Sequence, residues 1–499
     1  MGTDDGNLQL TRDGGRNWAN TIASVDRSGR VLPKASWVSW VEASRHDAAT
    51  AYATFDRHTF GDHGPYLFVT RDHGKSWEAL VTPGDAKGVR GFAHVIKEDL
   101  ESPGVLFLGT EFGLWVSIDG GRNWAAFRGG HFPAVAVRDI AIQPRDNDLV
   151  LGTHGRGIWI VDDITPLRAL SADLLSREAA FVQARPVQQR ISGPGGWANG
   201  AAVFVGDNPP DGAVITYYQR TRHLFGKLKL EIVDPEGNVI DELPASKRRG
   251  LNRVTWSMRV KPPRVPPAVQ LAYAGTQGPR VLPGTYAVRM TKGDDVREAK
   301  FEIGLDRRAD YTLTDRKAQH DAAMRVHRLF GEESALMDRI LAVRAGLAQR
   351  GEAAKDAGTR ARIAALDAQV DAVRKRIVAT KEGGAITGEE RLREHTDQLY
   401  GAIMSYEGAP AAYQVERIGV LEAELADIDA QFGGLLAGEL PSLNQALQSQ
   451  GLPPIDTPPR TAARASESSS ANSRWLATRK RKDKKAWHFS LPQETVIYR

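Results

Sequence analysis

The sequence predicts a multidomain protein that begins with a partial β-propeller and continues with a β-sandwich and an antiparallel α-helical bundle. Three observations lead to this fold class. An eight-residue pattern recurs three times within the first 124 residues, about seven short strands are predicted in residues 201–306, and apolar residues recur with helical spacing after Thr314. Several domains are expected, because 499 residues exceed the size at which one hydrophobic core stops growing.

The repeated pattern reads Ser or Thr, any residue, Asp, any residue, Gly, any residue, Ser or Asn, Trp, and its copies span residues 11–18, 70–77 and 117–124. We interpret each copy as a tight turn between two strands. In such a turn Asp accepts backbone hydrogen bonds, Gly adopts a positive φ and Trp packs against a sheet. The residues given this structural role are Asp13, Gly15, Trp18, Asp72, Gly74, Trp77, Asp119, Gly121 and Trp124.

A second repeated element sets the length of the repeating unit. A threonine that follows Gly or Ala recurs at Thr3, Thr54, Thr110 and Thr153. The spacings of 51, 56 and 43 residues are typical of a four-stranded propeller blade. Strands are predicted at 51–55, 105–108 and 149–151, and the last repeat, 158–163, keeps its strand but lacks the octapeptide. Residues 1–166 are therefore predicted to hold about three blades.

The octapeptide resembles the Asp-box, or BNR repeat, of sialidases, xyloglucan hydrolases and sortilin-type receptor propellers. The phrases GTEFGLWVSIDGG, LVLGTHGRGIWIVDDITPLR and NPPDGAVITYY, with the order of the domains, are similar to the C-terminal half of large bacterial proteins labelled BNR-repeat glycosyl hydrolases or sortilin-like propellers. This resemblance covers about residues 1–450. It implies an extracytoplasmic parent protein, periplasmic or secreted, and a box at the blade periphery, away from the ligand face. A shared fold does not by itself imply an activity.

The predicted propeller is incomplete. Propellers close with about 4–8 blades, and an open arc exposes unpaired sheet edges. We therefore expect the chain to be the C-terminal fragment of a longer protein that supplies the missing blades; the alternative is an arc completed by a second chain. The first residues show no signal-peptide pattern, and no run of about 18 apolar residues predicts a membrane span.

Residues 167–200 are predicted to form a linker, with 193–200 as its loosest part. The following region, 201–306, is predicted to be an immunoglobulin-like (Ig-like) sandwich, since short alternating strands flank a turn at 234–238. The phrases LKLEIVDPEGNVIDEL, GLNRVTWSMR and LPGTYAVRM are similar to the small Ig-like domain of the flagellar hook-capping protein family.

Residues 307–450 are predicted to form a bundle of four or so helices, because apolar residues share one face in 329–347, 363–377 and 418–432. Thr387 with Glu390 predicts a capping box that opens a further helix. Breaks are predicted at 383–384, 408–410 and 433–434. The bundle is interpreted as a buttress for the propeller, with an interaction module as the alternative.

Residues 451–499 are predicted to be a disordered basic tail, rich in Pro and Ser. Between 474 and 485 lie seven Lys or Arg residues and one Asp, which account for the net charge of +5 and leave the rest of the chain nearly neutral. The overall charge therefore does not indicate a nucleic-acid partner.

Catalytic and metal-binding patterns are missing from the sequence. The chain has no cysteine, no HExxH, no GxSxG and no P-loop, so no metal or cofactor is predicted. A glycosidase needs carboxylates at a defined separation, and a sialidase needs in addition an arginine triad and a Tyr–Glu pair. Suitable residue types occur without any local pattern that arranges them: Arg90, Arg138, Arg156, Asp56, Glu111 and Asp139. Tyr52 and Tyr66 fall inside predicted strands and are interpreted as structural.

The most distinctive polar segment is 153–157, Thr-His-Gly-Arg-Gly, matched one blade earlier by 110–113. Loops between consecutive strands reach one face of a propeller, so Glu111, His154 and Arg156 are the candidate ligand-binding residues, with Arg presenting a planar fork to a carboxylate. The alternative is that the glycines set the turn and Arg156 pairs with a neighbouring acid.

Two functions follow. The first is a non-enzymatic scaffold that binds a protein or carbohydrate (glycan) ligand. The second is a sialidase- or xyloglucanase-like glycoside hydrolase whose catalytic residues lie mostly in the missing blades.

Overall fold

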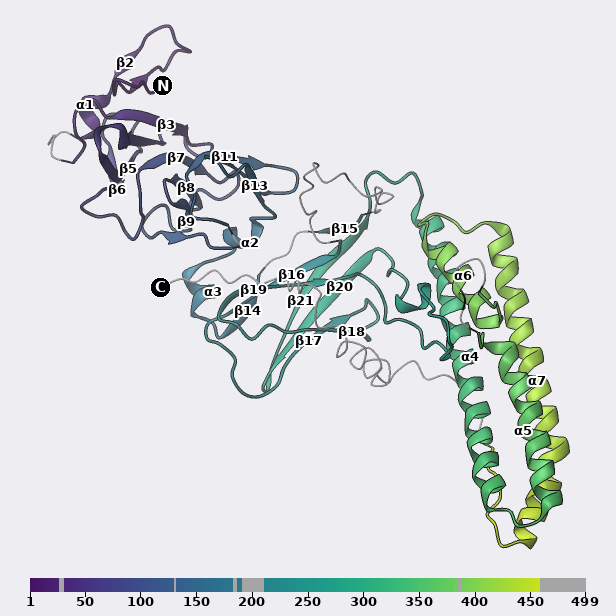
Figure 1. The fold of residues 1–499 in the computed structure, drawn as a ribbon. Coiled ribbons are helices and arrows are strands. Elements are labelled where there is room, and N and C mark those ends of the chain that lie inside the picture. The colour runs from purple at the N-terminus through teal and green to yellow at the C-terminus, as the bar shows by residue number, and fades with distance from the viewer. Residues whose placement is uncertain are drawn as a thin grey trace.

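The computed structural model describes residues 1–26, 31–129, 132–182, 186–190, 211–381, 383 and 388–457. Three regions follow one another along the chain in Figure 1: antiparallel sheets, a two-sheet sandwich and a set of long helices. Many antiparallel sheets followed by a helical region agree with the predicted propeller-like, multidomain architecture.

The first region consists of antiparallel sheets whose strands pair in chain order. One sheet contains β3 (Trp37–Ala43), β4 (Ala51–Arg57), β5 (Asp62–Thr70) and β6 (Glu78–Val81), and the next contains β7 (Ala93–Glu98), β8 (Leu106–Thr110), β9 (Gly113–Ser117) and β10 (Ala125–Ala126). The third contains β11 (Val137–Gln143), β12 (Asp148–Thr153) and β13 (Ile158–Val161), and β1 (Gln9–Leu10) pairs with β2 (Ala19–Asn20). Short helices are α1 (Ile22–Val25), η1 (His58–Phe60), α2 (Thr165–Arg168) and α3 (Ala172–Ser176).

Apolar side chains fill the space between successive sheets. Leu67 and Val69 of the first sheet share a core with Ile96 and Leu106 of the second. The opposite face of the second sheet, including Phe107, packs against the third. The first strands β3, β7 and β11 lie next to one another, so the sheets radiate from a common line as propeller blades do.

The three octapeptides adopt one hydrogen-bond pattern. In each copy the Asp Oδ1 accepts the backbone N–H four residues later at 2.9 Å, and the second glycine or its equivalent donates its N–H to the Ser or Thr hydroxyl at 2.8–2.9 Å. These glycines have φ of +90°, +76° and +85°. Hydrogen bonds from Ser76 hold the pKa of Asp72 at about 2. Trp124 is buried and Trp77 partly buried, whereas Trp18, beside a sheet of only two strands, is exposed.

The predicted linker, 167–200, contains two strands of the sandwich. β14 (Ala179–Phe181) pairs with β16 (Ala213–Gln219), and β15 (Val187–Gln189) runs parallel to β21 (Asp295–Leu305). The linker prediction is therefore wrong for 179–181 and 187–189, because such short strands lack a recognisable alternation of their own. Residues 193–200 lie outside the described part of the chain.

Two sheets pack face to face in this second region. One has the order β14-β16-β19 (Gly250–Trp256), and the other has the order β15-β21-β20 (Gly284–Lys292)-β17 (Leu228–Val233)-β18 (Val239–Leu243). Tyr217 and Trp256 of the first sheet meet Ile232 and Phe301 of the second in a shared core. The predicted turn at 234–238 joins β17 to β18, and η2 (Ala274–Thr276) lies in a later loop.

Two arginines hold the end of the first region, one against its own sheets and the other against the sandwich. Arg168 of α2 donates through Nε and Nη2 to the buried carboxylate of Asp99, at 2.8 and 2.9 Å. Arg253 of β19 donates to the backbone carbonyl oxygens of Asp162 and Asp163, at 3.1 and 2.6 Å. The bidentate pair holds α2 against the segment that follows β7. The two carbonyl contacts hold the end of the first region against the sandwich.

The helical region contains α4 (Leu313–Ala353), α5 (Ala357–Ile377), α6 (Leu392–Met404) and α7 (Ala412–Ser449), and the predicted apolar faces are buried in one core. α5 packs on the far half of α4, where Arg344 pairs with Asp367, and α6 packs on the near half, where Thr396 donates to Glu333. The two shorter helices, α5 and α6, thus lie end to end alongside α4 and α7 (Figure 1).

Two helix boundaries differ from the prediction. Gly433 and Gly434 lie inside α7, which continues to Ser449, because Phe432, Leu436 and Leu440 are buried on both sides of the glycines. α6 begins at Leu392, and Glu394 accepts the N–H of the N-cap residue Arg391, so the helix does not open with Glu390 in the predicted capping box; Thr387 lies outside the described residues. The hydrogen bond from Thr396 of α6 to Glu333 of α4 holds the first turns of α6 against α4.

The predicted tail begins beside the helices. Ile455 is buried against them and exchanges two hydrogen bonds with the Asn444 side chain, at 2.8 and 3.2 Å. Residues 458–499 lie outside the described part of the chain. Within the described part, none of the helices combines the length and apolar character that crossing a bilayer requires.

We predict that Gly434→Ala stabilises α7 by about 0.5–1 kcal/mol, because alanine loses less backbone entropy than glycine. A Cβ at this position meets no atom within 4 Å, and the residue has no positive φ. Thermal unfolding followed by circular dichroism measures the change. As a control, Gly121→Ala should destabilise, since φ is +85° and its Cβ would lie 2.9 Å from Leu80 Cδ1. A lower melting temperature for Gly434→Ala would contradict a continuous α7.

Candidate functional site

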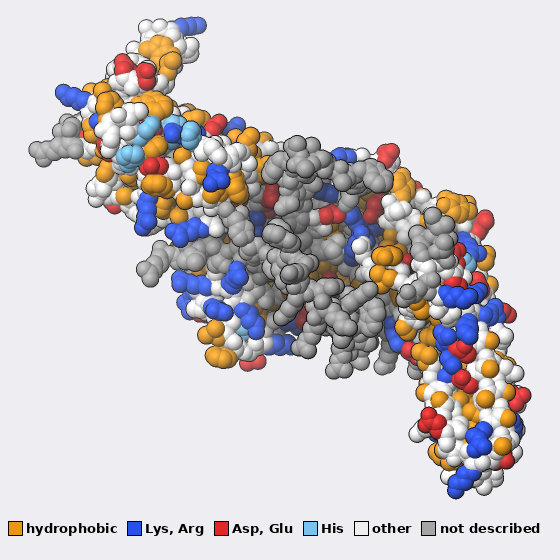
Figure 2. All heavy atoms as spheres, in the orientation of Figure 1, with side chains coloured by type: hydrophobic (Ala, Val, Ile, Leu, Met, Phe, Trp, Pro, Cys, Tyr) orange, Lys and Arg blue, Asp and Glu red, His pale blue; other side chains and the backbone are white. Residues whose placement is uncertain are grey.

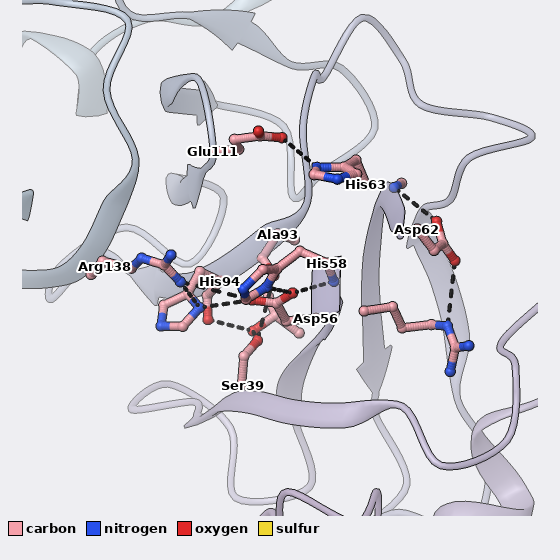
Figure 3. A network of polar contacts seen from close by, with 12 residues as sticks. Ser39, Asp56, His58, Asp62, His63, Ala93, His94, Glu111 and Arg138 are labelled. Carbon is pink, nitrogen blue, oxygen red and sulfur yellow. Dashed lines mark hydrogen bonds and ion pairs between the residues drawn. The ribbon is translucent and has the colours of Figure 1, made fainter. Parts of the chain in front are cut away.

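A group of polar side chains gathers at the strand ends opposite the octapeptides. The octapeptides follow the C-terminal ends of β5 and β9, and antiparallel pairing puts the end of β4 and the starts of β5, β7 and β11 at the other rim. We call the group at this rim the polar cluster. Its members, shown in Figure 3, are Asp56, His58, His63, His94, Glu111 and Arg138.

Asp56 is the centre of the polar cluster, with 1% of its surface exposed. Its Oδ1 accepts from His58 backbone N–H at 2.9 Å and lies 2.6 Å from His58 Nδ1, while Oδ2 lies 3.2 Å from His94 Nδ1. Arg138 Nη1 is 3.8 Å from Oδ2. Burial alone raises the pKa of Asp56, but the hydrogen bonds from His94 and His58 outweigh it and leave the pKa below 3.8.

His94 joins Asp56 to Arg138. Its Nδ1 lies 3.2 Å from the Asp56 carboxylate and 3.0 Å from Arg138 Nη1. This nitrogen either donates to Asp56 or accepts from Arg138, depending on the tautomer. Behind it, Thr54 Oγ1 donates to the His94 carbonyl at 3.0 Å and contacts Ser39 Oγ at 3.0 Å, which ties β3, β4 and β7 together beneath the ring.

Phe92 supports the exposed members of the polar cluster. The His58 ring stacks on it with centroids 4.6 Å apart and planes at 21°, and the Arg138 guanidinium lies 5.3 Å from its centroid. A cation over an aromatic face is held by the ring quadrupole as well as by contact area. Phe92 is buried, whereas the Arg138 side chain keeps 31% of its surface exposed. The platform therefore orients Arg138 without covering it.

Glu111 and His63 form a second pair within the polar cluster, and the His63 ring centroid lies 5.9 Å from that of Phe92. His63 Nδ1 lies 3.2 Å from Glu111 Oε2, and 55% of the His63 side chain is exposed. Gly91 passes close beneath: a Cβ there would lie 2.6 Å from Glu111 Cβ, and its φ is +76°. Only glycine fits so close to Glu111, so Gly91 allows Phe92 and Glu111 to lie near each other.

A neighbouring carboxylate has a structural role. Asp62 accepts from the Tyr66 hydroxyl at 2.8 Å and pairs with Arg57 Nε at 3.4 Å. Burial, with the hydrogen bond to Asp62, raises the pKa of Tyr66 to about 12. Tyr52 is also buried and donates to Glu98 at 3.2 Å, so both tyrosines are structural, as their strand positions predict.

Of the three predicted ligand-binding residues, Glu111 belongs to the polar cluster. His154 and Arg156 are exposed on the β12–β13 turn at the same rim, where Thr153 donates twice to the Gly157 carbonyl. Within the described residues Arg156 makes no ion pair. The His154 N–H donates to Ala136 at 2.9 Å, which connects this turn to the segment just before Arg138.

The sequence did not identify the histidines of the polar cluster. Asp139 accepts the next backbone N–H at 2.8 Å, while its neighbour Arg138 turns toward Asp56. The usable signal is position: His58, His63 and His94 each lie within two residues of a strand end at the same rim. Among the described residues, no set of three His, Asp or Glu side chains is arranged to hold a metal ion.

The geometry presents hydrogen-bond donors above a buried negative charge. Asp56 is ionised near neutral pH and is covered by its partners, so it neither donates a proton as a general acid nor reaches a substrate as a nucleophile. Arg138, His58 and His63 face outward on a fixed support. Such an arrangement suits a ligand with an acceptor group, above all a carboxylate.

We predict that Asp56→Asn lowers the free energy of unfolding at pH 7 by about 1–3 kcal/mol, because charge-assisted hydrogen bonds are lost in a buried setting. The lowered pKa of Asp56 means that its stabilisation is complete above the unfolded-state value of 3.8 and is lost as pH falls through the folded-state pKa. The variant should therefore lose less stability than the parent between roughly pH 5 and pH 3. Denaturant unfolding over this range measures both effects.

The matched control is Asp139→Asn, which removes an exposed carboxylate on β11, outside the polar cluster. This variant should show the same pH dependence of the free energy of unfolding as the parent. Equal pH dependence in Asp56→Asn and the parent would show that Asp56 is not the buried charge on which the rim depends.

Comparisons with known proteins give weak structural similarity only. No family model and no curated protein matches the sequence. Among solved structures, the chain is similar to YCF48 bound to D1 peptide (16% identity, TM-score 0.20, covering 37% of this chain and 71% of the other). It is also similar to a GH74 enzyme of Niastella koreensis (13% identity, TM-score 0.25, covering 61% of this chain and 51% of the other). A third similar structure is the extracellular domain of the one-component system BT4673 of B. thetaiotaomicron (11% identity, TM-score 0.22, covering 61% of this chain and 36% of the other).

Proposed function

We propose that the chain is a non-enzymatic, sortilin-like Asp-box (BNR) propeller scaffold that binds a protein or glycan ligand through a carboxylate, with the Ig-like sandwich and the helical bundle as accessory domains. The observation that carries the proposal is the burial of Asp56 beneath His58, His94 and Arg138. A buried acid that orients outward-facing donors is an arrangement for binding an anion.

Arg138 is the principal ligand contact in this proposal. Its guanidinium is 3.8 Å from Asp56 and stacks on Phe92, so the ion pair is loose and N–H groups remain for a ligand. The support from Phe92 and His94 reduces the side-chain entropy lost on binding. Glu111, with His154 and Arg156 on the next turn, would extend the contact surface across the rim.

The same geometry argues against glycoside hydrolysis on this rim. Retaining and inverting glycosidases both need two accessible carboxylates flanking the bond. Here Glu111 is accessible but Asp56 is covered, and Asp62 is engaged with Tyr66 and Arg57. A hydrolase would have to combine Glu111 with a carboxylate from outside the polar cluster.

We predict that Arg138→Gln weakens binding of acidic ligands by about tenfold or more, since a hydrogen bond to a charged group contributes about 1.5–3 kcal/mol. Arrays of acidic and neutral glycans and of acidic peptides provide the probes, and titration of the best binder gives the affinity. Arg122→Gln, at an exposed arginine in an octapeptide on the opposite rim, is the matched control and should bind as the parent does.

Two results would contradict the proposal. One is equal affinity of Arg138→Gln and the parent for every acidic probe. The other is turnover of a fluorogenic sialoside or of xyloglucan oligosaccharides that Glu111→Gln abolishes, which would favour the hydrolase.

A further inference from the structure

The loop between β16 and β17, residues 220–227, carries two apolar side chains into solvent. Leu224 is 62% and Phe225 is 87% exposed. Gly226 has a φ of +87°, and His223 Nε2 lies 3.2 Å from the Gly226 carbonyl, so the tip forms a closed turn. The loop holds both side chains outward, where each costs hydration free energy unless a partner covers it.

Basic residues surround this tip. Arg222 and Lys227 lie in the loop itself, and the adjacent loop contributes Lys247, Arg248 and Arg249, all exposed. The two loops are joined by the His223 N–H, which donates to the Lys247 carbonyl at 3.0 Å. Figure 2 shows basic and hydrophobic side chains gathered at this end of the sandwich, at the lower left of the central region.

Acidic residues at this end of the sandwich are fewer and mostly paired. Glu178 contacts Arg220 and Lys292, and Asp295 pairs with Arg297 at 2.8 Å. Asp294 is the other acid in the nearby hairpin, whose Gly293 N–H donates to the Lys227 carbonyl at 2.9 Å. The surface around Leu224 and Phe225 therefore has a positive balance.

We propose that this loop docks the protein on an anionic lipid bilayer, with Leu224 and Phe225 inserted at the boundary between headgroups and acyl chains. Apolar and aromatic side chains backed by Lys and Arg are the combination that binds such a boundary. Each cation near an anionic surface adds to the attraction, so Arg222, Lys227 and the three basic residues of the adjacent loop complement it. Two apolar residues are too few for the core of a stable protein interface, which buries about 800 Å² on each partner.

The test uses the full chain and vesicles of phosphatidylcholine with or without about one third phosphatidylglycerol. Co-sedimentation should show binding to the anionic vesicles only. Leu224→Ser combined with Phe225→Ser should weaken it about tenfold or more. The matched control, Val269→Ser with Tyr273→Ser, removes exposed apolar side chains from another loop and should bind as the parent does.

A site-specific probe separates this loop from the basic run at 474–485, which can also attract anionic vesicles. The chain has no cysteine, so Phe225→Cys allows one environment-sensitive fluorophore to be attached at the tip. Its emission should rise and shift to the blue on anionic vesicles, whereas a label at Tyr273→Cys should not respond.

Three outcomes would overturn the proposal: no response of the label at 225 although the protein sediments, equal binding to neutral vesicles, or a response to soluble poly-glutamate without one to vesicles. The last would indicate an acidic protein as partner. None of these readouts depends on Arg138, so they can fail while the proposed ligand site on the propeller stands.

Discussion

The packing of each antiparallel sheet against the next is the constraint on which the N-terminal region depends. The second sheet is apolar on both faces and is buried between the first and the third, with Ile96 facing one neighbour and Phe107 the other. This stacking brings the starts of β7 and β11 beside the end of β4. Asp56, His94 and Arg138, one from each of three successive sheets, meet for that reason.

Local signals in the sequence predict the repeating unit and the long helices well. The octapeptide makes its hydrogen bonds within eight residues, and the helical faces repeat within two turns, so both are visible without knowledge of the rest of the chain. The polar cluster is different in kind. Its contacts join residues 38, 44 and 48 positions apart, and no local pattern records which strand ends will meet.

The remaining errors have the same origin. β14 and β15 have three residues each and exist because distant strands pair with them. The two glycines in α7 favour a break by about 1 kcal/mol each, but burial of Phe432 and Leu436 against α4 and α5 contributes more. Local preference predicted the boundary, and tertiary packing decided it.

The end-to-end placement of α5 and α6 has a consequence for how this region can change in evolution. α4 and α7 are each one uninterrupted helix, whereas α5 and α6 are two separate helices beside them. A change of chain length between Ile377, where α5 ends, and Leu392, where α6 begins, lengthens neither α4 nor α7, so the apolar faces of the two long helices keep their phase. The connection between the two short helices can therefore change in length without moving the long helices relative to each other.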